Sequence, residues 1–224
     1  MSTSARNKHA FNELEKAAVY KAINERRDMR HFLSAPIEPE VLLRLLNASH
    51  RAPSVGLMQP WRIIRISDIQ LRQQIKSLVD EEVLNTAEQL DERQQEFLRL
   101  KVEGITDCAE VLVMSLMDNR EQHVFGRRTL PEMDLASVSC AIQNMWLAAR
   151  AEGLGMGWVS LFEPEKLATL LSIPDGAKPV AILCLGHVDE FYSAPMLELE
   201  QWRKADSLDD VLYENSWGQD NSSC

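Results

Sequence analysis

The stretch PEMDLASVSCAIQNMWLAARAEGLGMGWVSLF, residues 131–162, joins the strongest helical pattern of the chain to a strand-like segment. Pro131 stands near a first helical turn, where its missing N–H is tolerated. Apolar residues then recur at spacings of three and four: Leu135, Val138, Ile142, Met145 and Ala149. We predict a helix that buries this face and ends at Gly153.

The three glycines that follow this helix resemble the glycine fingerprint of a dinucleotide-binding loop. Such a loop follows a strand and opens a helix, because the helix N-terminus binds the phosphate. Here the order is reversed: the helix precedes Gly153, Gly155 and Gly157, and the strand-like GWVSLF follows. We therefore interpret Gly153 as the left-handed residue after the helix and all three glycines as parts of a turn.

The remaining sequence mixes helix and strand patterns without an internal repeat, which favours a single domain over residues 1–224. Helices are expected at 13–27 and 39–50, the latter with Leu42, Leu43, Leu45 and Leu46 on one stripe. Strands are expected at 61–66, 111–117 and 179–186. The last two are apolar enough to be buried on both faces.

Two polar regions are expected to lie outside the core. Residues 68–103 have a helical pattern with only a narrow apolar face, and the part from about 80 to 104 is predicted to project as a lid. Residues 190–217 have few helix signals and several aromatic residues, which suits an arm lying on a partner subunit. Residues 1–12 and 218–224 are expected to be flexible.

Composition narrows the classes of function. The formal net charge of −10 leaves no broad basic face for a nucleic-acid backbone. No apolar run approaches the roughly 20 residues that span a bilayer, so no membrane association is expected. Residues 1–16 lack the apolar region of a secretory signal, which makes a cytoplasmic location the expectation.

The four cysteines also argue against a metal centre. Cys108, Cys140, Cys184 and Cys224 are widely spaced and form no C-x-x-C pair, so neither a zinc site nor a disulfide framework is indicated. We expect three of them to pack as small buried side chains.

Three arginines within five positions form an unusual cluster in this acidic chain, in INERRDMRHF, residues 23–32. They either decorate a helix C-terminus, where cations are favourable, or bind an anionic ligand through their planar forks. On a helix, Arg26 and Arg30 would share one face. Asp28 is then either a salt-bridge partner of the arginines or a proton acceptor beside a bound ligand.

Four segments carry a resemblance to a known family: RRDMRHF, ASHRAPSVGLMQPWRI, CAIQNMWLAARAEGLGMGWVSLF and LCLGHVD. They are similar to the nitroreductase-like flavoproteins and, within them, to the 5,6-dimethylbenzimidazole synthases. The match covers about residues 15–217. Asp28 and the GWVSLF turn are the more specific marks of the synthase branch.

This resemblance implies an α+β fold with a central, mainly antiparallel sheet flanked by helices. It also implies a homodimer with domain-swapped C-terminal arms and FMN at the subunit interface. Residues 53–55 would come from the other subunit. The residues that would contact FMN are Arg26, Arg27, Asp28, Met29, Arg30, Pro53, Ser54, Val55, Gln59, Ser160, Leu161 and Arg203.

The implied reaction uses reduced FMN as substrate. Oxygen attacks the reduced flavin, the ring system is fragmented, and the ribityl C1′ becomes C2 of 5,6-dimethylbenzimidazole, the lower ligand of cobalamin. Asp28 and Ser160 would be the catalytic residues, and Arg93 and Lys101 would be candidate lid contacts. Without the resemblance, Ser160 reads as a strand hydroxyl bonded to backbone, Gln59 as a loop cap, and the lid charges as a solvated face.

Two rival functions remain open at this point. One is an NAD(P)H-dependent nitroreductase or flavin reductase that retains FMN; in the synthase, NAD(P)H would act only indirectly, through a separate flavin reductase. The other is a flavin-storing dimer without catalysis. Consumption of total flavin in the presence of a reductant and air separates the synthase from the reductase, and a storage dimer would bind FMN but show no flavin-dependent chemistry with any reductant.

Overall fold

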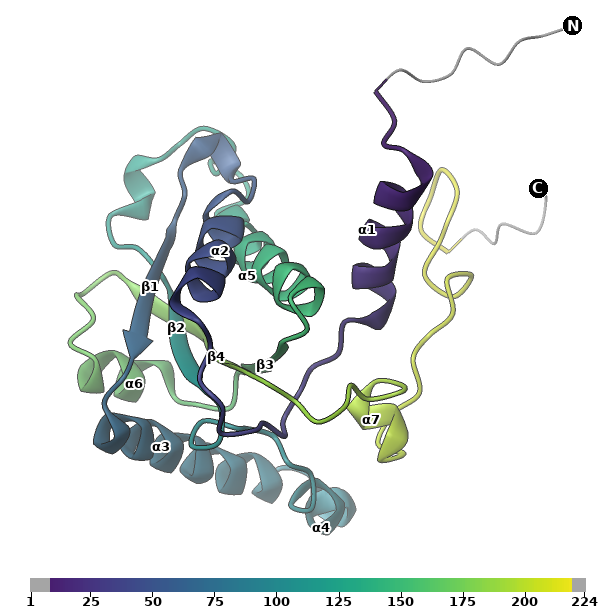
Figure 1. Cartoon of the computed structure of the whole chain (residues 1–224). Coiled ribbons are helices and arrows are strands. Elements are labelled where there is room, and N and C mark those ends of the chain that lie inside the picture. The colour runs from purple at the N-terminus through teal and green to yellow at the C-terminus, as the bar shows by residue number, and fades with distance from the viewer. Residues whose placement is uncertain (1–8, 219–224) are drawn as a thin grey trace, which may run out of the picture.

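The computed structural model describes residues 9–218 and has a four-stranded antiparallel sheet between two layers of helices (Figure 1). The strand order is β1-β2-β4-β3. The strands are β1 (Trp61–Ile66), β2 (Glu110–Leu116), β3 (Gly155–Val159) and β4 (Lys178–Gly186). The predicted α+β class with a central antiparallel sheet is therefore confirmed, as are the three strands expected at 61–66, 111–117 and 179–186.

Local sequence signals place the helix ends. Asn12 caps α1 in a capping box with Glu15, Pro39 opens α2, and the Asp68 side chain accepts the backbone N–H of Leu71 at the start of α3. The helices are α1 (Glu13–Glu25), α2 (Pro39–His50), α3 (Ile69–Glu88), α4 (Gln94–Phe97), α5 (Met133–Ala151), α6 (Pro164–Leu170) and α7 (Met196–Leu199). Short 3₁₀ turns lie at 55–57, 91–93 and 120–122.

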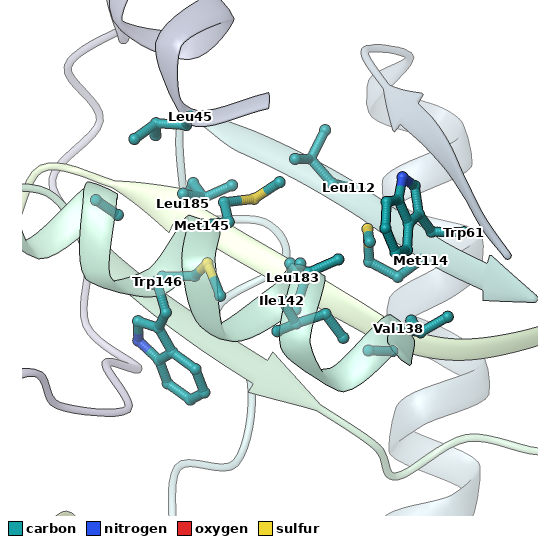
Figure 2. Close-up of a cluster of buried hydrophobic side chains, with 14 of the residues drawn as sticks. Leu45, Trp61, Leu112, Met114, Val138, Ile142, Met145, Trp146, Leu183 and Leu185 are labelled. Atoms are coloured by element: carbon teal, nitrogen blue, oxygen red, sulfur yellow. The ribbon is translucent and has the colours of Figure 1, made fainter. Parts of the chain in front are cut away.

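The core has two halves, one on each face of the sheet. Leu112 and Met114 of β2 point toward α2 and α5, where they meet Ile142 and Met145 (Figure 2). The alternate residues, such as Val111, point toward α3 and α6. Each fully buried aliphatic side chain contributes about 1.5–3 kcal/mol by leaving water. Burial on both faces, as expected from the apolar runs, is confirmed although the sheet is antiparallel.

Two expected core residues lie on the surface. Val138, Ile142, Met145 and Ala149 of α5 are fully buried, but Leu135, in the first turn of the helix, is 44% exposed and lines an open cavity. On α2, Leu42 and Leu45 are buried while Leu43 is exposed. The predicted stripe was too wide, since residues 42 and 43 are about 100° apart around a helix.

The expected helix from 68 to about 103 is wrong in its second half. Helix α3 ends at Glu88, and residues 89–104 form turns around the short α4. Helix α3 itself does not project, because Ile75 and Val79 are buried against the sheet. Only the segment after α3, from 89 to 104, therefore remains as a candidate lid.

The turn assigned to three glycines contains only one of them. Gly153 has φ +77°, as expected for the residue after a helix C-terminus. Gly155 and Gly157 instead lie inside β3. A Cβ on Gly157 would clash with the carbonyl oxygen of Met29, whose N–H donates to the Met156 carbonyl at 3.0 Å. These glycines let residues 28–30 run directly along the edge of the sheet.

Helix α1 and the C-terminal arm are poorly covered. Helix α1 has no buried residue, and it stands away from the sheet with the arm beside it (Figure 1). Leu14 of α1 is 85% exposed and Trp217 of the arm is 91% exposed. Isolated soluble chains rarely leave so much contiguous apolar surface in water.

The cysteines are less buried than expected. Cys108 and Cys184 are buried, but Cys140 is exposed on α5, so two of the described cysteines pack inside rather than three. Cys224 and most of the termini expected to be flexible lie outside the described residues, which are 9–218. Within that range, no helix combines the length and apolarity needed to cross a bilayer.

The close approach at Gly157 makes a testable prediction for stability. Gly157→Ala should lower the free energy of unfolding by about 3 kcal/mol, because the new methyl group meets a backbone carbonyl that cannot move aside. Gly155→Ala should cost only about 1 kcal/mol, because its methyl group meets the side chains of Val188 and Met29, which can rotate. Denaturant unfolding of both variants measures this. Equal losses would show that the backbone approach is not the limiting contact.

Candidate active site

The arginine cluster begins where α1 ends. Residue Arg26 is already extended, with φ −61° and ψ 134°, so the expected helical face shared by Arg26 and Arg30 is wrong. Trp146 of α5 holds this segment: its Nε1 donates to the Arg27 carbonyl at 3.1 Å, and the Arg26 guanidinium lies 4.7 Å from its ring centroid. Because side chains alternate along an extended chain, Arg27 is directed away from the side of its neighbour Arg26.

Asp28 and Arg30 together hold the backbone of Trp158. The Trp158 N–H donates to Asp28 Oδ1 at 3.0 Å, and the Trp158 carbonyl accepts from Arg30 Nη2 at 2.8 Å. The same Nη2 donates to Asp28 Oδ2 at 2.6 Å. Met29, between them, is buried and points away. The segment 28–30 thus places a carboxyl group and a guanidinium group at one end of β3.

Burial raises the pKa of the Asp28 carboxyl above its ordinary value of 3.8. The charge of Arg30, the Trp158 N–H and the charge of Arg26 act in the opposite direction but do not outweigh the loss of water. The side chain is 38% exposed in the single chain, so the shift rests on apolar neighbours rather than complete enclosure. A carboxylate with a raised pKa accepts a proton more readily than an ordinary aspartate does.

Some arginine donors have no partner within residues 9–218. The Arg30 side chain is buried, and both its Nε and its Nη1 lack a hydrogen bond. The Nε of Arg27 is also buried and unbonded, although its Nη1 donates to the carbonyls of Asn24 and Arg26 and its Nη2 donates to the carbonyl of Ser193. Unpaired buried donors are costly, so a ligand with hydrogen-bond acceptors fits here.

A cavity of about 190 Å³ opens beside Asp28 and Arg30. Residues 158–161 form its floor, so Ser160 and Leu161 line the same cavity as Asp28 and Arg30. The walls are apolar and come from two segments: Phe97, Leu100, Val102, Met196, Leu197 and Trp202. Ligand pockets commonly measure 300–1,000 Å³, so a single chain provides only part of a site for a molecule of flavin size.

The wall residues were missed by the sequence argument. Phe97 and Trp202 are 105 residues apart and belong to polar segments whose patterns predict little burial. Trp202 directly precedes Arg203, which was expected to bind the ligand but lies exposed and 3.4 Å from Asp206. In the sequence, the pairing of Trp202 with the cationic Arg203 in a polar arm is the one feature that could have indicated a cavity wall, and it is a weak indication.

The two candidate lid contacts have other partners in the single chain. Arg93 pairs with Glu96 and donates from Nη2 to the carbonyl of Trp202 at 2.9 Å. Lys101 pairs with Asp107 at 2.6 Å. Neither is among the residues that line the cavity. Both lie on the segment that covers it.

The loop at residues 53–59 lies far from the arginine cluster in the same chain. The N–H of Val55 donates to the Ser137 hydroxyl at 3.0 Å, whereas Arg27 contacts Trp146. Ser137 and Trp146 are nine residues apart on α5, or about 13.5 Å along its axis. Ser54 Oγ accepts the backbone N–H of Gln59, and Pro53 is exposed. The loop and the arginine cluster therefore lie along different parts of α5 in the single chain.

A larger cavity of about 500 Å³ begins on the other side of Ser160. An ion cluster forms part of its lining: Arg120 Nε and Arg127 Nη2 lie 2.9 and 3.0 Å from Asp134 Oδ2. Ser160 thus lines both cavities, and its hydroxyl makes no hydrogen bond within residues 9–218. Within residues 9–218, no group of three or more His, Cys, Asp or Glu side chains is arranged to bind a metal ion.

The family is shown by comparison with known proteins. Residues 23–187 match the model of the nitroreductase family, and the chain belongs to this family. The fold is also that of solved nitroreductase-like structures. Iodotyrosine deiodinase bound to FMN and 3-iodo-L-tyrosine has a TM-score of 0.69 at 20% identity, over 89% of this chain and all of that one. The NADPH:FMN oxidoreductase of Vibrio harveyi has a TM-score of 0.67 at 20% identity, over 91% and 80%.

Within the family, curated relatives point to one branch. A 5,6-dimethylbenzimidazole synthase of Rhodospirillum rubrum is 41% identical over 80% of this chain and 85% of its own length. A 5,6-dimethylbenzimidazole synthase of Rhodobacter capsulatus is 32% identical over 87% and 95%. The resemblance read from the sequence motifs is therefore confirmed.

The raised pKa of Asp28 predicts a particular pH dependence of stability. Above pH 3.8 the folded protein binds more protons at Asp28 than the unfolded chain, so stability falls as the pH rises through the folded pKa. Asp28→Asn removes this loss. The variant should therefore gain stability relative to the wild type as the pH rises from 3.8, until the gain levels off above the folded pKa. Urea unfolding at fixed protein concentration measures the difference.

Asp107 supplies a control of opposite sign. The hydrogen bond from Lys101 lowers the pKa of Asp107, so this carboxylate contributes stability that is complete above pH 3.8 and lost below it. Asp107→Asn should therefore be less stable than the wild type by a constant amount above pH 3.8. If the stability difference between Asp28→Asn and the wild type were also constant above pH 3.8, the pKa of Asp28 would not be raised. The charge of Arg30 would then outweigh the effect of burial on that pKa.

Proposed function

We propose that this protein is an enzyme that fragments reduced FMN with oxygen to give 5,6-dimethylbenzimidazole, the lower ligand of cobalamin. The observation that carries the proposal is the 41% identity to a curated synthase over most of both chains. The site agrees with it, since a carboxyl with a raised pKa lies beside unpaired arginine donors at the edge of a partly apolar cavity. The less favoured alternative is an NAD(P)H-dependent nitroreductase or flavin reductase that retains FMN.

FMN fits the residues present. Its acceptor-rich pyrimidine and ribityl groups would meet the buried Nε and Nη1 of Arg30 and the Nε of Arg27, which lack partners within residues 9–218. Its phosphate would meet Arg26 and the terminal nitrogens of Arg27, with Arg203 brought in by the arm. When reduced, FMN supplies the electrons for the reaction with oxygen.

The proposal requires a homodimer. The cavity is too small for a whole flavin, and residues 53–55 lie too far along α5 to reach the arginine cluster of their own chain. The exposed apolar side chains of α1 and the arm supply the surface for a second copy. The first part of the arm contacts its own chain, since Tyr192 accepts the Arg30 N–H at 3.2 Å, so an exchange of arms would begin beyond Trp202.

The chain's own residues then have distinct roles. Asp28 is oriented by the Trp158 N–H at one carboxylate oxygen and by Arg30 at the other, and it lines the cavity, where it would accept a proton from the ribityl chain. Ser160 lies on the cavity floor with its hydroxyl free to position the ring system. The apolar walls exclude water, which strengthens these polar contacts. The electrons reach FMN through a separate flavin reductase, with NAD(P)H as their indirect source, and the reaction takes place in the cytoplasm.

The phosphate assignment predicts a difference between two flavins. Arg26→Ala should weaken FMN by about 10- to 100-fold but riboflavin by less than threefold, because a lost charge-assisted hydrogen bond costs about 1.5–3 kcal/mol and riboflavin has no phosphate. Titration of both flavins measures the two affinities. Arg44→Ala, which breaks only a surface pair with Glu152, is the control. An equal loss for FMN and riboflavin would contradict the assignment.

The catalytic assignment predicts that Asp28→Asn separates binding from product formation. Asn keeps the size and the acceptor oxygen of Asp but removes the proton acceptor. A general base contributes about 10² to 10⁴ in rate, so 5,6-dimethylbenzimidazole formation should fall by that factor while reduced FMN still binds and is still oxidised by air. Single-turnover assays that follow total flavin and product measure this.

The wild type tests the function itself in the same assay. Loss of total flavin with appearance of 5,6-dimethylbenzimidazole is the expected result, and full recovery of oxidised FMN would favour the retained-flavin alternative. If Asp28→Asn gives a normal yield per bound flavin and only a weaker affinity, Asp28 is a structural partner of Arg30 and has no catalytic role.

A further inference from the structure

Two segments that are about 100 residues apart in the sequence meet over the cavity beside Asp28. The segment after α3 contributes Arg93 and Phe97, and the arm contributes Trp202. The Arg93 guanidinium carbon lies 3.5 Å from the centroid of the Trp202 ring, and Arg93 Nη2 donates to the Trp202 carbonyl at 2.9 Å. The rings of Phe97 and Trp202 are 6.0 Å apart.

The Arg93 side chain is fixed in this position. Its Nε and Nη2 both donate to the Glu96 carboxylate, at 3.1 and 3.0 Å, which sets the plane of the guanidinium. Its flat face then stacks on the indole, a preferred geometry for a cation and an aromatic ring. One residue thus holds the indole ring and the main chain of Trp202 at the same time.

Trp202 is also the point at which the arm leaves the cavity. Met196, Leu197 and Trp202 line it, whereas Arg203 and Leu208 are exposed. The indole therefore stands between the cavity and solvent on the side of the arm.

We propose that Trp202, held by Arg93, closes the cavity beside Asp28 to water while oxygen reacts with the reduced flavin. The inference rests on the proposed function. Open access favours the simple side reaction, in which reduced FMN and oxygen give oxidised FMN and hydrogen peroxide. Two electrons and two protons then pass from flavin to oxygen and no carbon–carbon bond breaks. A closed cavity suppresses this loss by excluding solvent from the site.

The ratio of 5,6-dimethylbenzimidazole to hydrogen peroxide, measured per bound reduced FMN in a single turnover with the FMN-loaded protein, tests the proposal. Trp202→Ala and Arg93→Ala should each lower this ratio at least fivefold. Trp202→Phe should recover at least half of the wild-type ratio, because it restores a ring for Arg93 and Phe97. Arg99→Ala, an exposed arginine on the same segment, should leave the ratio unchanged.

Acrylamide quenching of the fluorescence of bound oxidised FMN measures closure without turnover. The quenching constant should rise at least twofold in Trp202→Ala and Arg93→Ala and stay constant in Arg99→Ala. An unchanged ratio, or a lower ratio without increased quenching, would overturn the proposal, since the loss would not come from solvent access. If the wild type makes no 5,6-dimethylbenzimidazole, the proposed function fails, and the quenching result still decides whether Trp202 closes the cavity.

Discussion

The approach of residues 28–30 to strand β3 is the contact on which the rest of the site depends. Gly157 has no side chain, so the Met29 carbonyl can lie against it, and the Met29 N–H can bond to Met156. This register places Asp28 and Arg30 on either side of the Trp158 backbone. The floor of the cavity and the two charged groups beside it are thereby positioned by main-chain geometry rather than by flexible side chains.

Burial and charge oppose each other at this point. The ion pair with Arg30 alone would keep Asp28 ionised, yet the apolar surroundings raise its pKa. Arg30 is itself only partly satisfied, because two of its nitrogens have no partner in the described part of the chain. A site that leaves arginine donors unbonded and a carboxyl with a raised pKa is costly for the folded protein, and a ligand recovers part of that cost.

Much of the fold follows from local patterns. The buried face of α5, the apolar runs of β2 and β4 and the left-handed Gly153 could all be read before any contact was known, because hydrophobic spacing and the conformational freedom of glycine are properties of the local chain. The exposure of Leu135 and the turns at 89–104 could not be predicted in this way. Burial at a helix end and the length of a polar helix depend on which other segments pack against them. Of the site, the motifs indicated Asp28, Arg30 and Ser160 but not the walls around them.

Sequence patterns alone thus predicted the fold class, the family and the residues that carry charge at the site. Tertiary contacts were needed to show that Gly157 belongs to a strand and admits the Met29 carbonyl, that Arg30 is buried while Arg26 is half-buried against Trp146, and that Trp202 meets Arg93 across 109 positions. The physical reason is the same in each case. Spacing along the chain sets which side of an element a residue occupies, but long-range packing decides what, if anything, lies against that side.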